Sequence, residues 1–308
     1  MNEPCLYALI STYVPEHSLI LTDLAGGFLI KEIRNGKTYG NGVLHSFNDE
    51  PAIIGNDGSK FWYQKGELHR DNDEPAIIWP NGKKEWYQNG KLHRDNDRPA
   101  IVRVNNGTIE WYQKGELHRD NDLPAIIWPD GKKEWFQKGR KHRDNDLPAI
   151  IRINGDKEWY QNDLLHRDNG PAVIKQNGSQ EWFQNGKRHR DNDLPAILFP
   201  DGDKLWYQKG ELHRDNDLPA LISSYMYQDW YRNGQRHRDN DLPAIVWNNG
   251  TKEWFQNGKL HRDNDLPAVI EANGTQKWYQ NGELHRFSGP AIIYSDGTKE
   301  YYLYGYIL

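Results

Sequence analysis

A near-identical segment of about 24 residues recurs eleven times along the 308-residue chain. One copy runs from His118 through the letters RDNDLPAII to Trp135, and the next begins at His142. Self-similarity at a fixed period in this range is typical of a repeat array, in which each repeat packs on its neighbours. A residue present in every copy is therefore first a part of the building unit, whereas a catalytic group is needed only once. The histidines that mark the copies, 23 to 25 residues apart, are His45, His69, His93, His118, His142, His166, His189, His213, His237, His261 and His285.

The composition fits a thin array better than a large globular core. Only 36% of the residues are hydrophobic, yet the chain contains 13 Trp and 17 Tyr. Low hydrophobic content would also suit a disordered chain, but disordered chains are poor in aromatic residues. Repeats that contact only their neighbours need little apolar surface, so we expect an ordered array.

Charge and cysteine content narrow the class of protein further. The 39 basic and 44 acidic residues are finely interleaved, with a net charge of -5, so we expect no basic stripe for nucleic acid. The single Cys5 cannot form an intrachain disulfide and suits a reducing compartment. No apolar run approaches the ~18 residues of a membrane span, and residues 1–14 lack the basic start of a secretory signal. These features predict a soluble protein of the cytoplasm.

Within each repeat the pattern predicts a β-hairpin. Pro-Ala precedes two aliphatic residues, as in Ala76 to Ile78, then a turn such as Pro80 to Gly82, then a second strand at 84–88. Asn-Gly and Asp-Gly between apolar runs are strong hairpin signals, because both central residues tolerate positive φ. The expected fold is all-β: an elongated array of tandem β-hairpins forming a continuous antiparallel sheet with two strands per repeat. At most one short helix is expected, before residue 28.

A tryptophan in the second strand of ten repeats forms a second regular row. An aromatic residue follows it on the other face, as Phe136 follows Trp135, so both faces of the sheet carry apolar rows. A one-sided sheet covered by helices does not fit this pattern. The row consists of Trp62, Trp86, Trp111, Trp135, Trp159, Trp182, Trp206, Trp230, Trp254 and Trp278.

Three zones are expected along the chain. Residues 1–27 do not match the repeat and are expected to form an N-terminal cap, since terminal repeats must cover an otherwise exposed face. Residues 28–50 form a degenerate half-repeat, in which Tyr39 and Gly42 stand at the aromatic and glycine positions. Residues 51–308 contain the eleven tandem repeats.

One segment of the repeat, aromatic-x-x-Gly-x-x-His, resembles the MORN repeat, as in Phe183, Gly186 and His189. The turn at Asp201-Gly202 and the aromatic residues after it match as well, and the resemblance covers about residues 28–308. Three departures mark a divergent branch: Arg replaces the Gly after His, the Gly between the paired aromatics is missing, and Pro-Ala is added. The resemblance implies an elongated single-layer sheet that acts as a scaffold, sometimes dimeric and sometimes lipid-binding.

The near-identical Asn- and Asp-rich copies also resemble repeat proteins that are abundant in giant DNA viruses of amoebae. For a protein of that kind, the expected location is the host cytoplasm. Fold-level resemblance alone does not establish a function.

The triplet His-Arg-Asp, as at His213 to Asp215, also occurs in the catalytic loop of protein kinases. That loop needs an Asn five residues past the Asp, together with a separate nucleotide site. Here the corresponding position is Ala220, and no glycine-rich loop or strand lysine accompanies the triplet. We therefore predict no kinase site and no catalytic residue.

The motif Asp-Asn-Asp, as at Asp71 to Asp73, permits two interpretations. Rows of carboxylate oxygens could bind Ca²⁺. Alternatively, Asp and Asn form a turn in which they accept backbone N–H groups. Two copies shorten this loop and place a Gly in it, at 168–171 and 287–290, which favours the turn.

The histidine row gives no metal site, because equivalent residues of successive hairpins lie about 9–10 Å apart, two strand spacings. A hydrogen-bonded framework histidine, with the following arginine paired to an aspartate, is the expected arrangement. We predict no cofactor and no metal.

The third position after Pro-Ala varies between copies, unlike the two aliphatic positions before it. Neighbouring residues of a strand point to opposite faces, so this position shares a face with the first aliphatic residue and should form a lengthwise row. A row that mixes Trp and Arg is typical of protein-binding hot spots, although the Trp residues could also stack on sugars or be tolerated surface aromatics. The predicted partner-binding residues are Trp79, Arg103, Trp128, Arg152, Lys175, Trp247 and Glu271.

The sequence thus predicts a non-enzymatic scaffold for protein–protein interaction or assembly, with a protein partner or a second copy of the chain. One alternative is a ligand-binding array for lipid head groups, glycans or calcium, which would include contact with a membrane surface. The other is an enzyme that uses the N-terminal segment, but about 27 residues are too few to build a site alone.

Overall fold

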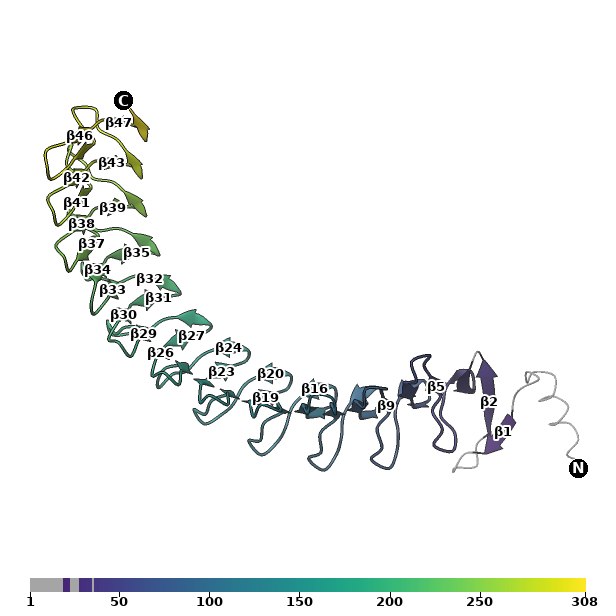
Figure 1. Ribbon diagram of the computed structural model, residues 1–308. Helices are drawn as coiled ribbons and strands as arrows, with labels where there is room; N and C mark the ends of the chain where they lie inside the picture. The colour runs from purple at the N-terminus through teal and green to yellow at the C-terminus, as the bar shows by residue number, and fades with distance from the viewer. Residues whose placement is uncertain (1–18, 23–27, 35) are drawn as a thin grey trace, which may run out of the picture. The chain divides into compact units, whose positions relative to one another are not determined.

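The computed structural model describes residues 19–22, 28–34 and 36–308. Every regular element in these ranges is a β-strand and every pairing is antiparallel, so the predicted all-β array of tandem hairpins is confirmed (Figure 1). None of the described residues belongs to a helix that could span a membrane. We expected a short helix before residue 28. Of these residues the structure describes only 19–22, which form the strand β1 (Leu19–Thr22). The rest of the expected segment lies outside the described residues.

The described residues form two compact halves: those up to residue 145 together with 149–153, and residues 146–148 with 154–308. In each half, two strands of every repeat pair in chain order and form an uninterrupted ladder. In the first half, β9 pairs with β10, β10 with β13, and so on to β21. The second half repeats this order from β22 to β46.

The ladder strands of the first half are β1, β2 (Phe28–Arg34), β3 (Lys37–Gly40), β4 (Val43–Leu44), β5 (Ile53–Ile54), β6 (Lys60–Phe61), β9 (Ile77–Ile78), β10 (Lys84–Glu85), β13 (Ile101–Val102), β14 (Ile109–Glu110), β17 (Ile126–Ile127), β18 (Lys133–Glu134) and β21 (Ile150–Ile151). Those of the second half are β22 (Lys157–Glu158), β25 (Val173–Ile174), β26 (Gln180–Glu181), β29 (Ile197–Leu198), β30 (Lys204–Leu205), β33 (Leu221–Ile222), β34 (Tyr227–Asp229), β37 (Ile245–Trp247), β38 (Lys252–Glu253), β41 (Val269–Ile270), β42 (Gln276–Lys277), β45 (Ile292–Ile293) and β46 (Lys299–Glu300).

Each repeat also contains a second, smaller hairpin that the sequence analysis did not count. The predicted second strand is interrupted at its tryptophan: Trp86 follows β10 and precedes β11. The Trp86 N–H donates to the Ala100 carbonyl of the next repeat at 2.8 Å, and its carbonyl accepts from His93 at 3.0 Å. Trp86 is therefore the junction of the two pairings, because its N–H continues the β10–β13 ladder and its carbonyl begins the separate small hairpin.

These small hairpins are β7 (Tyr63–Gln64) with β8 (Glu67–Leu68), β11 (Tyr87–Gln88) with β12 (Lys91–Leu92), β15 (Tyr112–Gln113) with β16 (Glu116–Leu117), β19 (Phe136–Gln137) with β20 (Arg140–Lys141), β23 (Tyr160–Gln161) with β24 (Leu164–Leu165), β27 (Phe183–Gln184) with β28 (Lys187–Arg188), β31 (Tyr207–Gln208) with β32 (Glu211–Leu212), β35 (Tyr231–Arg232) with β36 (Gln235–Arg236), β39 (Phe255–Gln256) with β40 (Lys259–Leu260), β43 (Tyr279–Gln280) with β44 (Glu283–Leu284), and β47 (Tyr302–Leu303) with β48 (Tyr306–Ile307).

The turn between the two ladder strands differs from our prediction. Only Gly82, with φ of 81°, has positive φ in the turn at 80–82; the preceding Asn does not. Gly82 donates to the Trp79 carbonyl at 3.0 Å, and the Trp79 N–H donates to the Lys83 carbonyl at 2.9 Å. This is a type I turn followed by a left-handed glycine, because Pro80 fixes its own φ at a negative value.

The turn of the small hairpin does have two residues with positive φ. Asn89 has φ of 48° and Gly90 of 71°, as a type I′ turn requires. Both N–H groups donate to the end of the preceding small hairpin: Asn89 to the His69 ring at 3.1 Å and Gly90 to the Leu68 carbonyl at 2.9 Å. The turn therefore fastens one repeat to the one before it.

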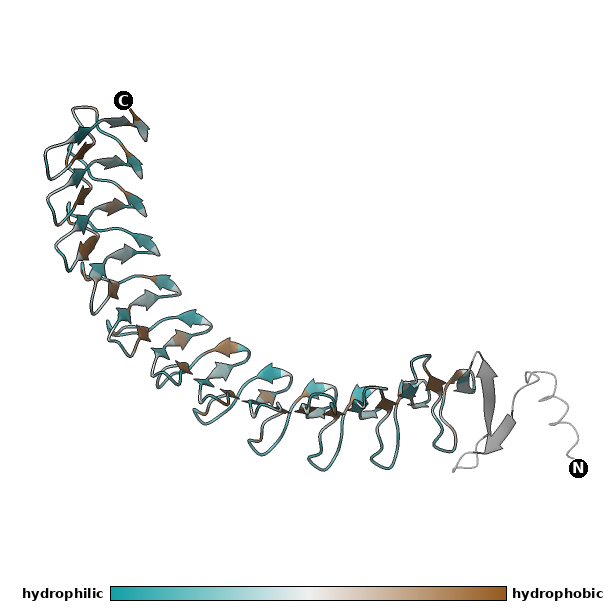
Figure 2. Cartoon of the chain, viewed as in Figure 1, coloured by the Kyte–Doolittle hydropathy of each residue, from teal (hydrophilic) through white to brown (hydrophobic). Residues whose placement is uncertain are grey.

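The core consists of small clusters of buried side chains, such as the one that contains Ala125, Ile126 and Phe136. Hydrophobic strands such as β9 alternate with hydrophilic strands such as β10, and the turns and loops are mostly hydrophilic (Figure 2). In the second half, Trp159, Ala172 and Phe183 form one buried cluster, with Leu165 and Val173 packed against it. The repeat alanines are 0–1% exposed, which explains why this position admits no larger side chain.

We predict that the Trp row stabilises the fold locally. Trp159 is 6% exposed, so Trp159→Ala should lower the free energy of unfolding by about 3–5 kcal/mol through the lost packing and the cavity left behind. Because repeats couple mainly to their neighbours, hydrogen exchange should accelerate around residues 157–183 and stay unchanged near residue 270. An even acceleration along the second half would contradict this prediction.

Candidate functional site

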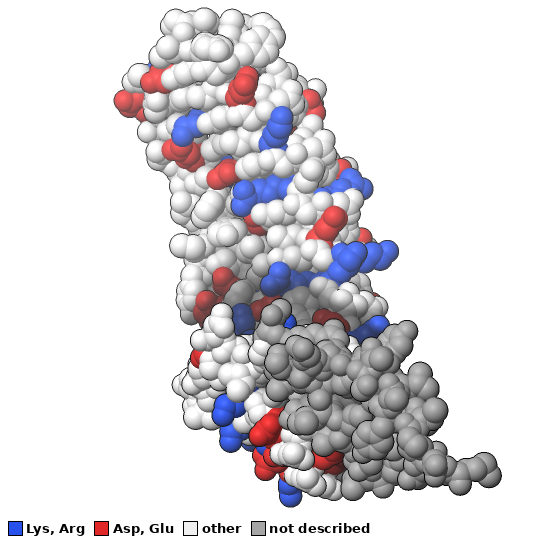
Figure 3. Space-filling view, turned by 90° about the vertical axis from the view of Figure 1, so that its right-hand side faces the viewer, with Lys and Arg blue, Asp and Glu red and all other residues white. Residues whose placement is uncertain are grey.

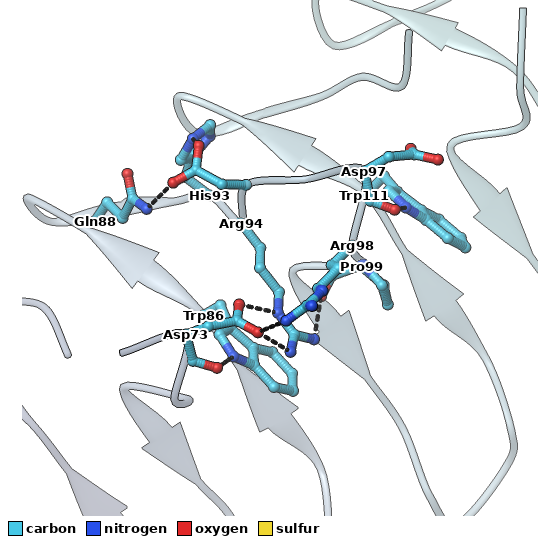
Figure 4. Close-up of polar contacts among 10 residues, drawn as sticks. Asp73, Trp86, Gln88, His93, Arg94, Asp97, Arg98, Pro99 and Trp111 are labelled. Carbon is cyan, nitrogen blue, oxygen red and sulfur yellow. Dashed lines mark hydrogen bonds and ion pairs between the residues drawn. The ribbon is translucent and has the colours of Figure 1, made fainter. Parts of the chain in front are cut away.

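The recurring motif His-Arg-Asp-Asn-Asp forms a set of contacts that join neighbouring repeats (Figure 4). The Arg94 guanidinium lies 3.8 Å from the centroid of the Trp86 ring and donates to both carboxylate oxygens of Asp73, at 2.7 and 2.9 Å. The Asp73 carbonyl accepts the indole N–H of Trp86 at 2.9 Å. Arg94 also donates to the Pro99 carbonyl at 3.3 Å. We call this arrangement the Arg–Trp–Asp clasp.

The clasp connects two successive copies of the loop that contains the motif. Asp73 lies in one loop, Arg94 begins the next, and Arg98 of that second loop adds another ion pair to Asp73. Where the preceding loop is shortened, as at 168–171, the second aspartate is missing. Arg190 then keeps its stack on Trp182 and its bond to the Pro195 carbonyl. The stack and the two bonds to the aspartate recur with Arg70, Arg94, Arg119, Arg143, Arg167, Arg214, Arg238, Arg262 and Arg286.

The histidine of the motif uses both of its ring nitrogens, which confirms the framework role predicted for it. His93 Nδ1 accepts the backbone N–H of Lys114, in the turn of the next small hairpin, at 3.2 Å. In the neutral ring the proton therefore lies on Nε2, which is 3.1 Å from Oδ1 of Asp95. The other carboxylate oxygen of Asp95 accepts from Gln88 at 2.7 Å.

The two aspartates of the motif serve different partners. Asn72 and Asp73 both have φ of 59°, and the Asp71 carbonyl accepts from Glu74 at 3.2 Å, so the motif is a turn. The Asp71 carboxylate accepts from His69, while that of Asp73 is bound to arginine. Within residues 36–308, no three His, Cys, Asp or Glu side chains gather as metal ligands would.

In the first half, the predicted partner-binding residues lie directly after the first ladder strand of successive repeats. The Trp79 indole donates to Glu85 at 2.7 Å, and the Trp128 indole donates to Glu134 at 2.9 Å. Arg103 pairs with the carboxylate at 110 at 2.8 Å. Trp128 is exposed, and Trp79, Arg103 and Arg152 are half-buried.

In the second half, the predicted residues also face a charged side chain of the partner strand. Lys175 pairs with Glu181 at 2.9 Å, and the Trp247 indole donates to Glu253 at 2.8 Å. Glu271 forms an ion pair with the lysine at 277, so the two charges are reversed in this repeat. Lys175 is exposed, and Trp247 and Glu271 are half-buried.

The sequence analysis missed that the variable position changes together with the residue six or seven places later. Phe199 stands six places before Leu205, an apolar residue in the place of the usual glutamate, and the reversed charges at Glu271 and Lys277 show the same coupling. Phe199, Ser223 and Tyr294 hold the same position as the predicted residues but were left out of the set. Comparison of the copies at two positions at once, rather than one, would have found these pairs.

No protein-family model matches the sequence, and no curated protein matches it.

On the visible face of the described chain, basic and acidic side chains are interspersed and neither sign forms a large patch (Figure 3).

The clasp lowers the pKa of its aspartates. Hydrogen bonds from Arg94, with a further one from Arg98, lower the pKa of Asp73 to about 2. Hydrogen bonds from the clasp arginines also lower the pKa of Asp49, Asp97, Asp122, Asp146, Asp193, Asp241 and Asp265.

We predict acid sensitivity from these shifts. An aspartate whose folded pKa is depressed contributes stability above its unfolded pKa of about 3.9, and this stability is lost as pH falls through the folded value. The urea midpoint should therefore drop progressively as pH falls from about 4 to about 2. Asp73→Asn should make this drop less steep, because the variant lacks one of the groups. A midpoint that stays constant below pH 4 would refute the prediction.

We also predict that the clasp needs arginine in particular. Arg214 stacks on Trp206 at 3.9 Å and binds both oxygens of Asp193, geometry that lysine cannot reproduce. Arg214→Lys should lower the free energy of unfolding by about 1–2 kcal/mol in urea titrations.

Arg232→Lys is the matched control for this variant. Arg232 pairs with Asp239 at 3.2 Å, and both side chains are 58% exposed. The control should cost less than about 1 kcal/mol, as exposed ion pairs do. Equal losses in the two variants would show that the clasp geometry is not what stabilises the array.

Proposed function

We propose that this protein is a non-enzymatic repeat scaffold that binds a protein partner along the variable row of its hairpins. The recurring polar groups support this proposal, because Arg, Trp and Asp of each clasp are bonded to one another rather than arranged around a reactive centre. What remains to distinguish one segment of the array from another is the set of residues that changes between repeats.

The tryptophans of the row are the strongest anchors for such a partner. Each indole N–H of Trp79, Trp128 and Trp247 is bonded to a glutamate six residues later, which fixes the ring on its strand. A ring held in one orientation loses little side-chain entropy on binding, so it provides apolar contact area at low cost. Tryptophan and arginine are the residues most enriched in interface hot spots.

The hairpin architecture is compatible with a divergent MORN-like array, and we infer that the protein acts as such a scaffold in a cytoplasm, that of a host cell if the protein is viral. The strand pairing supports this inference, because each repeat adds two strands to an existing ladder and so extends the binding surface without altering it elsewhere.

The test replaces Trp79, Trp128 and Trp247 together by Ser. Lys83 and Lys132 still pair with Glu85 and Glu134, so these carboxylates keep a partner and the circular dichroism spectrum should not change. Capture of proteins from a cell extract by the full chain, quantified by mass spectrometry, should fall for a specific set of partners.

The matched control replaces Glu67, Glu116 and Glu211 together by Gln, three exposed residues of the small hairpins. This control should capture the same proteins as the parent chain. If the tryptophan variant is folded and captures the parent's partners undiminished, the row is not the binding surface and the proposal fails.

A further inference from the structure

The repeat that begins at His285 lacks an acceptor that nine other repeats possess. In those nine, the histidine Nε2 lies 2.9–3.2 Å from the carboxylate of an aspartate two residues later. In seven of them a glutamine donates to the same carboxylate. Here Phe287 replaces the aspartate, while His285 and Gln280 are both retained.

His285 therefore carries a proton without an acceptor. Its Nδ1 accepts the Tyr304 N–H at 3.1 Å, so in the neutral ring the proton lies on Nε2. His285 is only 5% exposed, and its Nε2 has no hydrogen-bond partner. A buried donor without an acceptor costs free energy, which a ligand that supplies the acceptor would recover.

Phe287 does not fill the position as a core residue. The same replacement occurs at Phe47, two residues after His45, and there the ring is 7% exposed because Gly40 leaves room for it. In the later repeat Gln280 stands at the position that corresponds to Gly40. Phe287 is accordingly 74% exposed, with its ring packed against the edge of His285 at 4.5 Å between centroids.

We propose that His285 and Gln280 bind the side-chain carboxylate of an aspartate or glutamate on a partner protein. The carboxylate would occupy the place that the internal aspartate holds in the other repeats, accepting the Nε2 proton of His285 and an amide proton of Gln280. Rotation of the exposed Phe287 about its χ1 admits the ligand.

The charges around the site favour this ligand. A cavity of about 260 Å³ beside His285 is lined by two arginines and two aspartates, Arg262, Arg286, Asp263 and Asp265. The corresponding cavity one repeat earlier is lined by the same number of arginines and three aspartates. The later cavity thus has one carboxylate fewer, and a carboxylate from a partner restores the number found in its neighbour.

The aromatic rings select what accompanies the carboxylate. Tyr304 lies 4.3 Å from the His285 ring and is 56% exposed, and the Phe287 and Tyr304 ring centroids are 6.0 Å apart. These two rings flank the buried donor with apolar surface. The ligand that fits is an acidic side chain with an apolar neighbour, on a protein rather than as a free anion.

The experiment uses the full chain and two blocked peptides, acetyl-Leu-Asp-Gly-amide and its Asn analogue. Histidine labelled with ¹⁵N reports the Nε2–H signal of His285, assigned by its disappearance in His285→Asn. The Asp peptide should shift this signal and the Asn peptide should not. A third peptide, acetyl-Leu-Gly with a free terminal carboxylate, should bind about tenfold more weakly if the side chain is the group recognised.

Two variants decide the assignment. Phe287→Asp supplies the carboxylate from within the chain and should weaken the Asp peptide by at least about tenfold. Phe287→Ala uncovers the donors without filling the site and should keep the binding. Equal shifts by the Asp and Asn peptides, binding that survives Phe287→Asp, or binding lost in Phe287→Ala would each overturn the proposal. The tryptophan variant of the row should leave this binding unchanged, so the two proposals fail independently.

Discussion

The stack of an arginine on a tryptophan, with one aspartate holding both, is the interaction on which the rest of the structure depends. The aspartate carbonyl accepts the indole N–H of Trp86 and its carboxylate binds Arg94, so one residue orients both members of the stack. Burial of an indole normally leaves its N–H to be satisfied, and here the preceding loop provides the acceptor. Because the aspartate belongs to the preceding loop, the same contacts that bury the tryptophan ring also join the two repeats.

The loops around the clasp are explained by this requirement. Asn72 and Asp73 adopt positive φ, which Asn and Asp tolerate better than most residues, and this turns the Asp73 carbonyl and carboxylate toward the next repeat. Where the loop is one residue shorter, the aspartate is lost and Trp182 is less buried than its equivalents. The letters that recur most strictly in the sequence are thus the ones that contact a neighbouring repeat.

Much of the fold could be predicted from local sequence, because hairpin turns depend on a few residues close together. The strand positions around Ile77 and the type I′ turn at Asn89 are of this kind. The break at Trp86 could not be predicted, because its N–H still bonds to Ala100 of the next repeat while its carbonyl already bonds to His93, and the local pattern does not mark this change of partner. Strand alternation was enough to place the row of variable positions on one face. Their pairing with the opposite strand was missed, because the repeats were compared at one position at a time, whereas the two paired residues change together. The unfilled acceptor at His285 was also missed, although the replacement of aspartate by Phe287 is visible in the sequence.

The pairing inside each hairpin has a consequence for how such a chain can change. Residues that vary, such as Glu271 and Lys277, find their partner within the same hairpin, whereas residues that contact the next repeat are shared by nearly all copies. A segment of 24 residues can therefore be duplicated, deleted or exchanged as one block. Each variable residue and the residue that pairs with it lie in the same segment, and the residues that contact the neighbouring repeats are nearly the same in every copy. The number and order of repeats, and with them the pattern along the row, can be rearranged without a new packing problem at any junction.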